Sequence, residues 1–410
     1  MGVFSGGNKV ALLQGGDELF PAMIKTIERA RHEVWVATYI FNDDPAARSV
    51  LVALFAAVQR GVNVRLLVDG FGTNGALQKL AQECRQHGVT LAVFRPLHRW
   101  KSWFQPGQLR RMHQKLCVVD EEAAFVGGVN LIDDHFDLRH GWSERPRLDF
   151  SVQIHGPAVI SIRQTIRALW TRSWLGQELR EELLALAHSS HRWSRIRKIL
   201  KRVRMERTSK TIDLTEPLKP VQVAFVVRDN LRQRRTIERH YISAIRQAQN
   251  RIDLICPYFY PGRAFRRALI QAARRGVQVR LVLQGRPDYQ MARFAASALY
   301  AELQAAGVRI FEYMPAFLHA KVALVDHDWA TVGSSNIDPL SLLLNLEANI
   351  VVRDIGFNAE LAVRFEDAVS MSVEVDDQFI KRLWYGPWRR ALVASLAHIY
   401  LRVAGRSGRY

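Results

Sequence analysis

Two short segments of the chain carry the same trio of polar side chains at the same spacing. In RMHQKLCVVD, residues 111–120, a histidine, a lysine and an aspartate flank an apolar run, and FLHAKVALVD, residues 317–326, repeats the pattern. Because successive side chains of a strand point to opposite faces, His113 and Lys115 lie together on one face. A histidine beside a fixed cation can act as a nucleophile or a proton donor next to a bound anion.

Both copies extend to one longer motif, His-x-Lys-x4-Asp-x6-Gly-(Gly/Ser)-x-Asn. Each copy predicts a strand, a short polar turn and a returning strand, so the hairpin brings its asparagine back toward the histidine and lysine. The aspartates lie an odd number of positions from their histidines, which puts them on the opposite face, and we interpret them as anchors of the turn. The motif residues are His113, Lys115, Asp120, Gly127, Gly128 and Asn130 in the first copy and His319, Lys321, Asp326, Gly333, Ser334 and Asn336 in the second.

Two histidines, two lysines and two asparagines around one centre are suited to a phosphodiester. Its phosphorus is attacked in line, so one imidazole can attack while the other protonates the departing oxygen. Lysine and asparagine side chains can hold the non-bridging oxygens and stabilise the charge that builds on them. The sequence contains no HExxH or comparable ligand run, so we predict neither a metal ion nor a cofactor.

Each motif is followed by an acid that begins an alternating apolar stretch. RLDFSVQI contains Asp149, and NLEANIVV contains Glu347. A histidine that carries a phosphoryl group needs its other ring nitrogen held, as in a catalytic triad. We therefore predict that Asp149 and Glu347 orient the histidines, with an ordinary acid at a strand end as the alternative.

The two motifs lie in two similar halves of the chain. Residues 244–285 echo residues 26–70: each contains a helix, an apolar strand, a second helix closed by Gly61 or Gly276, and a second strand. Alternating strands and helices predict an α/β fold in which each half is a mixed, largely parallel sheet flanked by helices. The repetition predicts a pseudo-twofold with one active site at the seam.

The charge of the chain indicates a polyanionic partner. Its 410 residues include 58 Lys and Arg against 39 Asp and Glu, a formal net charge of +19, which attracts either nucleic acid or an anionic membrane. Three widely spaced cysteines indicate neither a zinc site nor disulfides, which suits a reducing compartment. No apolar run has the length of a membrane span or a signal-peptide core.

Basic segments with interleaved aromatic residues separate and follow the halves. We expect an N-terminal half over residues 1–175, a basic linker over 176–220, a C-terminal half over 221–375 and a membrane-associating tail over 376–410. The alternatives are a solvated linker helix, a basic loop packed on its domain and a terminal helix docked on the core. The candidate membrane-binding residues are Trp100, Trp103, Phe104, Trp384, Trp388, Arg389 and Arg390.

The doubled motif resembles that of the phospholipase D superfamily, and the resemblance covers nearly the whole chain. Within it, residues 329–352 look like bacterial cardiolipin synthases, and residues 228–245 and 257–269 look like the shorter type B synthases, which lack N-terminal transmembrane helices. The resemblance implies a ping-pong reaction in which a phosphatidyl group passes to a histidine and then to an alcohol.

The resemblance also implies roles for the motif residues. His113 resembles the nucleophile and His319 the general acid and base, and the reverse assignment stays open. One residue breaks the symmetry, because Gly128 stands where the second copy has a serine, so we expect non-equivalent half-sites. The implied phosphate-binding residues are Lys115, Lys321, Asn130 and Asn336, assisted by Ser334.

For this family, two phosphatidylglycerols give cardiolipin and glycerol without a cofactor. The implied partners are phosphatidylglycerol, other phospholipids and an anionic membrane surface, with no nucleic acid, and the implied place is the cytoplasmic side of the inner membrane, bound peripherally. Two alternatives are a metal-free nuclease or phosphodiesterase and a membrane-binding module without activity. The sequence sets neither the acceptor alcohol nor the oligomeric state.

Overall fold

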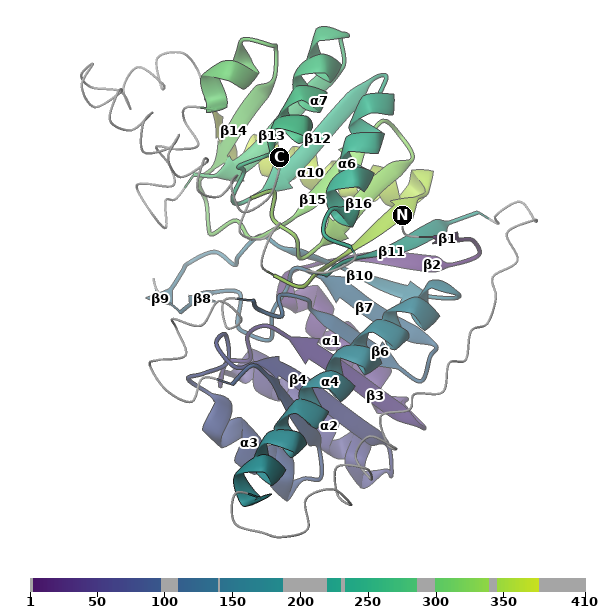
Figure 1. Cartoon of the computed structure of the whole chain (residues 1–410). Coiled ribbons are helices and arrows are strands. Elements are labelled where there is room, and N and C mark those ends of the chain that lie inside the picture. The colour runs from purple at the N-terminus through teal and green to yellow at the C-terminus, as the bar shows by residue number, and fades with distance from the viewer. Residues whose placement is uncertain are drawn as a thin grey trace.

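The structure is a computed structural model that describes residues 3–96, 110–138, 141–186, 220–229, 233–285, 299–338 and 345–375. The described chain forms two α/β halves, each built on one large sheet. Figure 1 shows the N-terminal half, in purple to blue, below the C-terminal half, in green to yellow. None of the helices in this part of the chain is long and apolar enough to cross a membrane.

The sheet of the N-terminal half has seven strands, in the order β2-β10-β7-β6-β3-β4-β5. Its middle is a buried hairpin, β6 and β7, whose two strands lie within the first motif. The strands are β2 (Lys9–Gln14), β3 (Glu33–Thr38), β4 (Asn63–Asp69), β5 (Thr90–Phe94), β6 (Leu116–Val119), β7 (Ala123–Gly127) and β10 (Phe150–His155). A separate two-stranded hairpin joins β8 (Phe136–Asp137) to β9 (Gly141–Trp142).

The sheet of the C-terminal half has nine strands, in the order β1-β11-β17-β16-β15-β12-β13-β14-β18. The hairpin of the second motif, β15 and β16, lies between β17 and β12, just as β6 and β7 lie between β3 and β10 in the first sheet. The strands are β1 (Phe4–Ser5), β11 (Gln222–Arg228), β12 (Arg251–Cys256), β13 (Gln278–Gln284), β14 (Arg309–Tyr313), β15 (Val322–Val325), β16 (Trp329–Gly333), β17 (Glu347–Arg353) and β18 (Ser372–Glu374).

Both sheets are mixed, but the expectation that they are largely parallel is wrong. Only β3-β4-β5 and β12-β13-β14 pair in parallel, and the other neighbours are antiparallel. The parallel strands come from the strand–helix–strand repeats that the sequence analysis recognised. The motif hairpin and the strand after it add antiparallel pairs, because a short turn can join only antiparallel neighbours.

Helices cover both sheets, and their ends follow from local sequence. Asp44 begins α2 by accepting a hydrogen bond from the Ala47 N–H at 2.9 Å, with Pro45 in the first turn. Gly61 and Gly276 have φ of 86° and 91°, the left-handed conformation expected after α2 and α7. The helices are α1 (Gly15–Glu28), α2 (Pro45–Gln59), α3 (Leu77–Gln86), α4 (Ala158–Leu186), α6 (Thr236–Gln247), α7 (Arg263–Arg274) and α10 (Ile355–Ser370).

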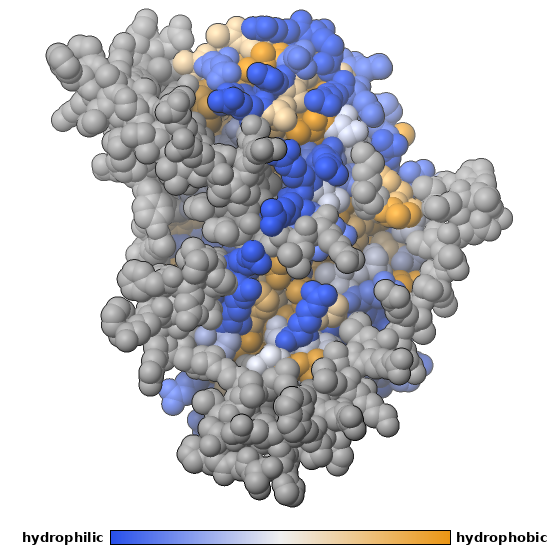
Figure 2. All heavy atoms as spheres, viewed as in Figure 1, coloured by the Kyte–Doolittle hydropathy of each residue, from blue (hydrophilic) through white to orange (hydrophobic). Residues whose placement is uncertain are grey.

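The halves share one hydrophobic core at the seam. It includes Val126, Phe150 and Val152 from the first sheet with Val332 and Ile350 from the second. The helix α4 continues beyond residue 175, where the linker was expected to begin. On the face seen in Figure 2, hydrophilic side chains gather over the outer part of the C-terminal half, with hydrophobic side chains between them.

Candidate active site

The two histidines enter the seam on segments that cross to the opposite half. The His113 N–H donates to the Leu346 backbone oxygen at 3.0 Å, and the His319 N–H donates to the Leu148 backbone oxygen at 2.9 Å. Met112 forms an isolated β-bridge with Leu346. Leu318, the residue before His319, forms the equivalent β-bridge with Leu148. Each histidine is therefore positioned by backbone from the other half.

Each histidine is also held by the acid of the other half. The His113 Nδ1 lies 3.0 Å from Glu347 Oε2, and the His319 Nδ1 lies 2.5 Å from Asp149 Oδ2. His113 Nδ1 is also 3.2 Å from the Ser334 carbonyl oxygen, which can only accept, so this nitrogen carries a proton. The ring centroids of the two histidines are 6.4 Å apart. With Nδ1 engaged on both rings, Nε2 is the nitrogen of each ring that is left to contact a ligand.

Two buried lysines lie beside the histidines. The Lys115 Nζ donates to the His113 backbone oxygen at 2.7 Å, and the Lys321 Nζ donates in the same way to the His319 backbone oxygen. Burial lowers the pKa of Lys115 to about 7 and that of Lys321 to about 8, although nearby carboxylates oppose the change. An anion bound between the rings would raise the pKa of both lysines and favour their charged forms.

The two acid–histidine pairs differ in their electrostatics. Burial lowers the pKa of both histidines; Glu347 opposes this at His113, whereas Lys321 and Arg147 push the pKa of His319 well below its usual value. Burial raises the pKa of Asp149 to about 6. Burial also raises that of Glu347, but His113 and Lys115 outweigh it and leave this pKa below its ordinary value.

Ser334 and the two asparagines complete the centre. The Ser334 Oγ donates to Glu347 Oε2 at 2.5 Å, and the Asn130 Oδ1 accepts from the Ile40 N–H at 3.2 Å. Three buried polar atoms here have no hydrogen-bond partner within the described residues: Gln114 Oε1, Asn336 Oδ1 and Glu347 Oε1. Unsatisfied polar atoms around a small seam are a feature of a site that receives a polar ligand.

Several residues of the site were not found from the sequence. The Tyr39 ring lies 4.9 Å from the ring of His113, between centroids. Asp69 Oδ2 accepts from the Met112 N–H at 2.9 Å, and Gln284 Oε1 accepts from the Leu318 N–H at 3.2 Å, so each fixes the residue before a histidine. The alignment of VNVRLLVDG with VQVRLVLQG contained this second signal, because Asp69 and Gln284 end equivalent strands.

Asp120 and Asp326 lie at the far ends of β6 and β15, away from the histidines. Asp120 accepts from the backbone N–H groups of residues 31, 32 and 33, and Asp326 accepts from those of residues 249, 250 and 251. Each carboxylate therefore ties the motif turn to the loop that precedes a neighbouring strand.

The candidate membrane-binding residues lie outside the described residues. These are Trp100, Trp103, Phe104, Trp384, Trp388, Arg389 and Arg390. Within the described part of the chain, no group of three or more His, Cys, Asp or Glu is placed to hold a metal ion.

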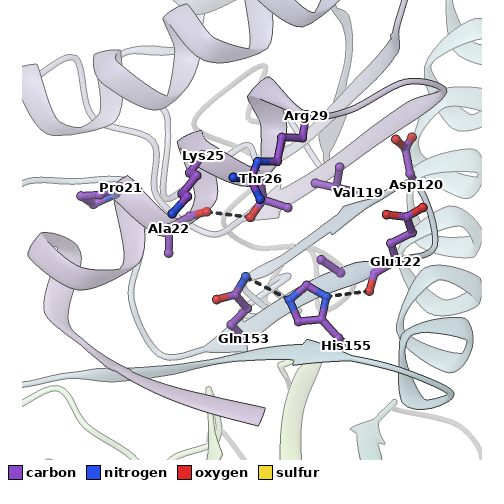
Figure 3. Close-up of a pocket in the computed structure, with 11 residues that line it drawn as sticks. Pro21, Ala22, Lys25, Thr26, Arg29, Val119, Asp120, Glu122, Gln153 and His155 are labelled. Carbon is purple, nitrogen blue, oxygen red and sulfur yellow. Dashed lines mark hydrogen bonds between the residues drawn. The ribbon is translucent and has the colours of Figure 1, made fainter. Parts of the chain in front are cut away.

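A surface cavity of about 520 Å³ lies apart from the histidines, near the turn between β6 and β7. Figure 3 shows Lys25 and Thr26 of α1 facing Gln153 and His155 of β10 across it. The His155 Nδ1 lies 3.1 Å from the Glu122 backbone oxygen. None of the site residues except the turn anchor Asp120 lines this cavity.

A family model described as "Cardiolipin synthase, PLD-like domain" matches residues 23–142 and 241–369. The chain belongs to the cardiolipin synthase family. Both matched segments of the cardiolipin synthase domain contain a histidine–lysine pair, and the second also contains Glu347, whereas Asp149 lies just beyond the first.

Curated relatives support the cardiolipin synthase assignment over most of the chain. Cardiolipin synthase B of Shigella flexneri and that of Escherichia coli K12 are each 36% identical over 381 residues, which cover 92% of this chain and 85% of the relative. Cardiolipin synthase A of Pseudomonas fluorescens is 31% identical over 372 residues, which cover 90% of this chain and 70% of the relative.

Solved structures show the same fold at low identity. The phosphatidylserine synthase of Haemophilus influenzae Rd KW20 matches with a TM-score of 0.62 at 13% identity, covering 96% of this chain and 93% of that one. The polyphosphate kinase of Porphyromonas gingivalis matches with a TM-score of 0.54 at 15% identity, covering 90% of this chain and 49% of that one. The cardiolipin synthase family thus shares its two-half architecture with other proteins.

Proposed function

We propose that this protein is a cardiolipin synthase that moves a phosphatidyl group from one phosphatidylglycerol to another through a phosphohistidine. The observation that supports it most strongly is the crossed arrangement of the histidines. Each is held at Nδ1 by the acid of the opposite half, and the two rings face one seam with two buried lysines beside them. Such a centre attacks and protonates a phosphodiester from opposite sides.

In the first step, Nε2 of His113 attacks the phosphorus of the donor. The nitrogen–phosphorus bond forms as the bond from phosphorus to the glycerol oxygen breaks, and His319 gives its proton to that oxygen. The bound anion raises the pKa of His319, so the substrate itself favours the protonated ring that this step needs. Glycerol leaves, and the phosphatidyl group remains on His113.

In the second step, a hydroxyl of another phosphatidylglycerol gives its proton to the now neutral His319. Its oxygen attacks phosphorus, the nitrogen–phosphorus bond breaks, and cardiolipin forms while His113 returns to its starting state. Glu347 stabilises the positive charge on His113 in the intermediate, which its lowered pKa suits, since the carboxylate stays ionised. Lys115, Lys321 and the two asparagines hold the non-bridging oxygens in both steps.

The substrates place this chemistry at a membrane surface. We propose peripheral binding to the anionic cytoplasmic face of the inner membrane, supported by the formal net charge of +19. The basic linker and tail predicted from the sequence belong to this proposal. Neutralising Arg389 and Arg390 together with Trp384→Ala should weaken sedimentation with phosphatidylglycerol vesicles, and unchanged binding would contradict a role for the tail.

The overall reaction is tested by incubating the purified protein with vesicles of labelled phosphatidylglycerol, followed by mass spectrometry of the lipids. We expect cardiolipin and an equal amount of free glycerol. Phosphatidic acid as the main product would instead indicate a hydrolase, and cleavage of single-stranded DNA with no change in the lipid would indicate a nuclease.

The covalent step is tested by trapping the intermediate. Phosphatidylglycerol mixed with a His319→Ala variant should leave a phosphatidyl group on the protein, because the attacking His113 remains while the base that activates the acceptor is missing. The His113→Ala variant should carry none. An adduct found only on His319, in the His113→Ala variant, would reverse the two roles.

A further inference from the structure

One arginine beside the reacting histidines has no counterpart in the other half. Arg147 lies two residues before Asp149, and the equivalent position before Glu347 is Asn345. The Arg147 side chain is 9% exposed, so a full positive charge is nearly enclosed on this side of the seam alone. Burial raises the pKa of the neighbouring Asp134 and Asp149 carboxyls and the charge of Arg147 opposes this rise, so part of this charge already faces carboxylates.

The contacts of Arg147 leave much of its guanidinium unused. Nη2 donates to the Phe136 backbone oxygen at 2.8 Å and lies 3.6 Å from Asp137 Oδ2, and the backbone N–H donates to the Asp134 oxygen. These contacts fix the arginine against the β8–β9 hairpin. Among the described residues, neither Nε nor Nη1 has a hydrogen-bond partner, so an edge of the guanidinium remains for a ligand.

Arg147 lies within reach of the group that handles the acceptor. Asp149 holds His319 at 2.5 Å, and side chains two positions apart in an extended segment lie on one side, roughly 6.5–7 Å apart. The charge of Arg147 also contributes to the low pKa of both His319 and Lys321. The arginine is thus close to His319 but outside the cluster that surrounds the reacting phosphorus.

The acceptor phospholipid carries a phosphate, whereas the glycerol that leaves in the first step does not. Glycerol leaves past His319 as a neutral molecule, and the acceptor then places its glycerol hydroxyl at the same histidine with a phosphodiester attached to the far end. Standard bond lengths put that second phosphorus roughly 6 Å from the attacking oxygen.

We infer that Arg147 binds the phosphate of the acceptor phospholipid and so selects phosphatidylglycerol over neutral acceptors such as glycerol and water. This inference rests on the proposed function. A planar guanidinium suits the task, because it offers two parallel donors to a phosphate. Only the His319 side has to receive a second phosphate, which gives a chemical reason for arginine here and asparagine in the other half.

Arg111 is a matched comparison. It lies two residues before His113, its equivalent in the second half is Phe317, and its side chain is 13% exposed. Its Nη1 lies 3.7 Å from Asp69 Oδ1 and donates to the Arg95 oxygen at 3.3 Å, and this aspartate fixes the residue before His113. Arg111 therefore supplies a comparable charge on the side of the other histidine, where no second phosphate has to bind.

The test measures how the phosphatidyl group is divided among acceptors. The full-length protein is given phosphatidylglycerol vesicles and isotope-labelled free glycerol, and mass spectrometry follows cardiolipin, labelled phosphatidylglycerol and phosphatidic acid together. In Arg147→Gln we expect the ratio of cardiolipin to the other two products to fall roughly 10- to 100-fold, the effect of losing a charged hydrogen bond. Arg147→Lys should restore part of the ratio.

The controls separate this role from general effects. The ratio does not depend on how much of a variant is folded, so a partly unfolded sample still gives an answer. Arg111→Gln should lower all products together, and Arg145→Gln, an exposed change in the same loop, should leave them unchanged. An unchanged ratio in Arg147→Gln would overturn the inference, whereas a native protein that makes no cardiolipin would overturn the proposed function instead.

Discussion

The two halves share one plan of strands but surround their histidines differently. His113 has Glu347 at its Nδ1, a serine that supports this glutamate, and the ring of Tyr39 beside it. His319 has Asp149 at its Nδ1 and a one-sided positive charge from Arg147. The comparison teaches that the duplicated sheet supplies the symmetric positions, while the identity of a few neighbours gives the two rings different surroundings.

The small difference between Gly128 and Ser334 has a physical cause. A Cβ atom at Gly128 would lie 2.2 Å from Asp149 Oδ1, which is already engaged with the Phe150 N–H at 2.9 Å. In the other half the acid is one carbon longer, and Ser334 fits beside it and donates to it. The pair of aspartate and glycine cannot be exchanged for the pair of glutamate and serine one residue at a time, so the two choices belong together.

The halves also differ where a helix covers the sheet. Arg65 pairs across strands with Trp35 and lies 4.5 Å from its ring centroid, whereas the equivalent Arg280 pairs with Asp253 through hydrogen bonds of 2.8 and 2.9 Å. Glu366 of α10 joins the second cluster at 2.7 Å. Arg65 also lies 3.8 Å from Glu33, and Arg280 lies 4.8 Å from the Phe365 ring centroid. The halves therefore differ in the partner across the strand, which is an aromatic ring for Arg65 and a buried carboxylate for Arg280.

The largest effect that we predict comes from removing the arginine that pairs with Asp253. Arg280→Met removes both hydrogen bonds to the fully buried Asp253, which keeps only Arg251 at 3.9 Å, and should lower the free energy of unfolding by about 3 kcal/mol. Arg65→Met removes a cation–aromatic contact and should lower it by only about 1 kcal/mol. Denaturant titration of both variants measures the difference.

The pH dependence of the Arg280→Met loss is a further check. Burial already raises the pKa of Asp253, and removing the arginine raises it further. A carboxyl whose folded pKa is raised favours the folded state at low pH and loses that contribution as the pH rises. The loss in Arg280→Met should therefore be greater at pH 8 than at pH 5, and equal losses in the two arginine variants would contradict the comparison.

The next effect concerns the lysines, which should be equivalent in the two halves. Lys115→Met and Lys321→Met should each reduce kcat by roughly 100- to 1000-fold, since each removes a preorganised donor to the phosphate. The melting temperature should stay the same or rise, because a buried charge is replaced by an apolar chain. Lys25→Met, on the exposed surface at the distant cavity, is the control, and near-normal turnover in either buried variant would sink the shared site.

A smaller effect sharpens the contrast between the two acids. Gly128→Ser should displace Asp149 and lower kcat, with a loss of stability of about 1–3 kcal/mol from overpacking. Combining it with Asp149→Glu should recover part of the activity, because this pair reproduces the serine and glutamate of the other half. Ser334→Gly should be milder, since it leaves space rather than a clash. A double variant no better than Gly128→Ser alone would show that the two positions are independent.

The smallest effect is a shift in the pH profile. For the donor, kcat/KM should fall below a pKa of about 6, as Asp149 takes a proton and ceases to accept from His319. It should fall again as the pH rises through the pKa values of the groups that must carry a proton: His319, whose pKa is lowered, and Lys115 and Lys321, with pKa values of about 7 and about 8. Asp149→Asn should remove the acidic limb, whereas Glu347→Gln should lower activity without moving it, because the pKa of Glu347 is already below its ordinary value.

The sequence predicted the parts of the site that are repeated. His113, Lys115 and their counterparts follow from spacing alone, and Asp149 and Glu347 follow from their place at the start of aligned strands. The crossing of acids and histidines could not be predicted, because it depends on how two sheets meet rather than on either sequence copy. Tyr39 and Arg147 were missed for a related reason: a search for repetition cannot find residues that occur once.

The fold was predicted in outline and wrong in one respect. The repeated order of strands and helices gave the α/β class and the two halves. The direction of strand pairing was misjudged because strands such as β10 and β17, which follow each motif, return to the sheet antiparallel to it. The neighbour of a strand is set by packing between distant segments, and local patterns carry little information about it.

Strand β1 pairs with a strand of the other half that is made much later. Phe4 and Ser5 pair with Ala224 and Val223 of the other half, and the Ser5 hydroxyl reaches across 218 positions of sequence. During synthesis on the ribosome, the partner of Ser5 is made 218 residues later than Ser5 itself. The next strand, β2, completes the first sheet beside β10, so the N-terminal half can form early while its leading residues wait. Closure of such a long loop is a slow event in folding. A bulky fusion at the N-terminus would therefore disturb the sheet of the C-terminal half, far along the sequence from the point of attachment.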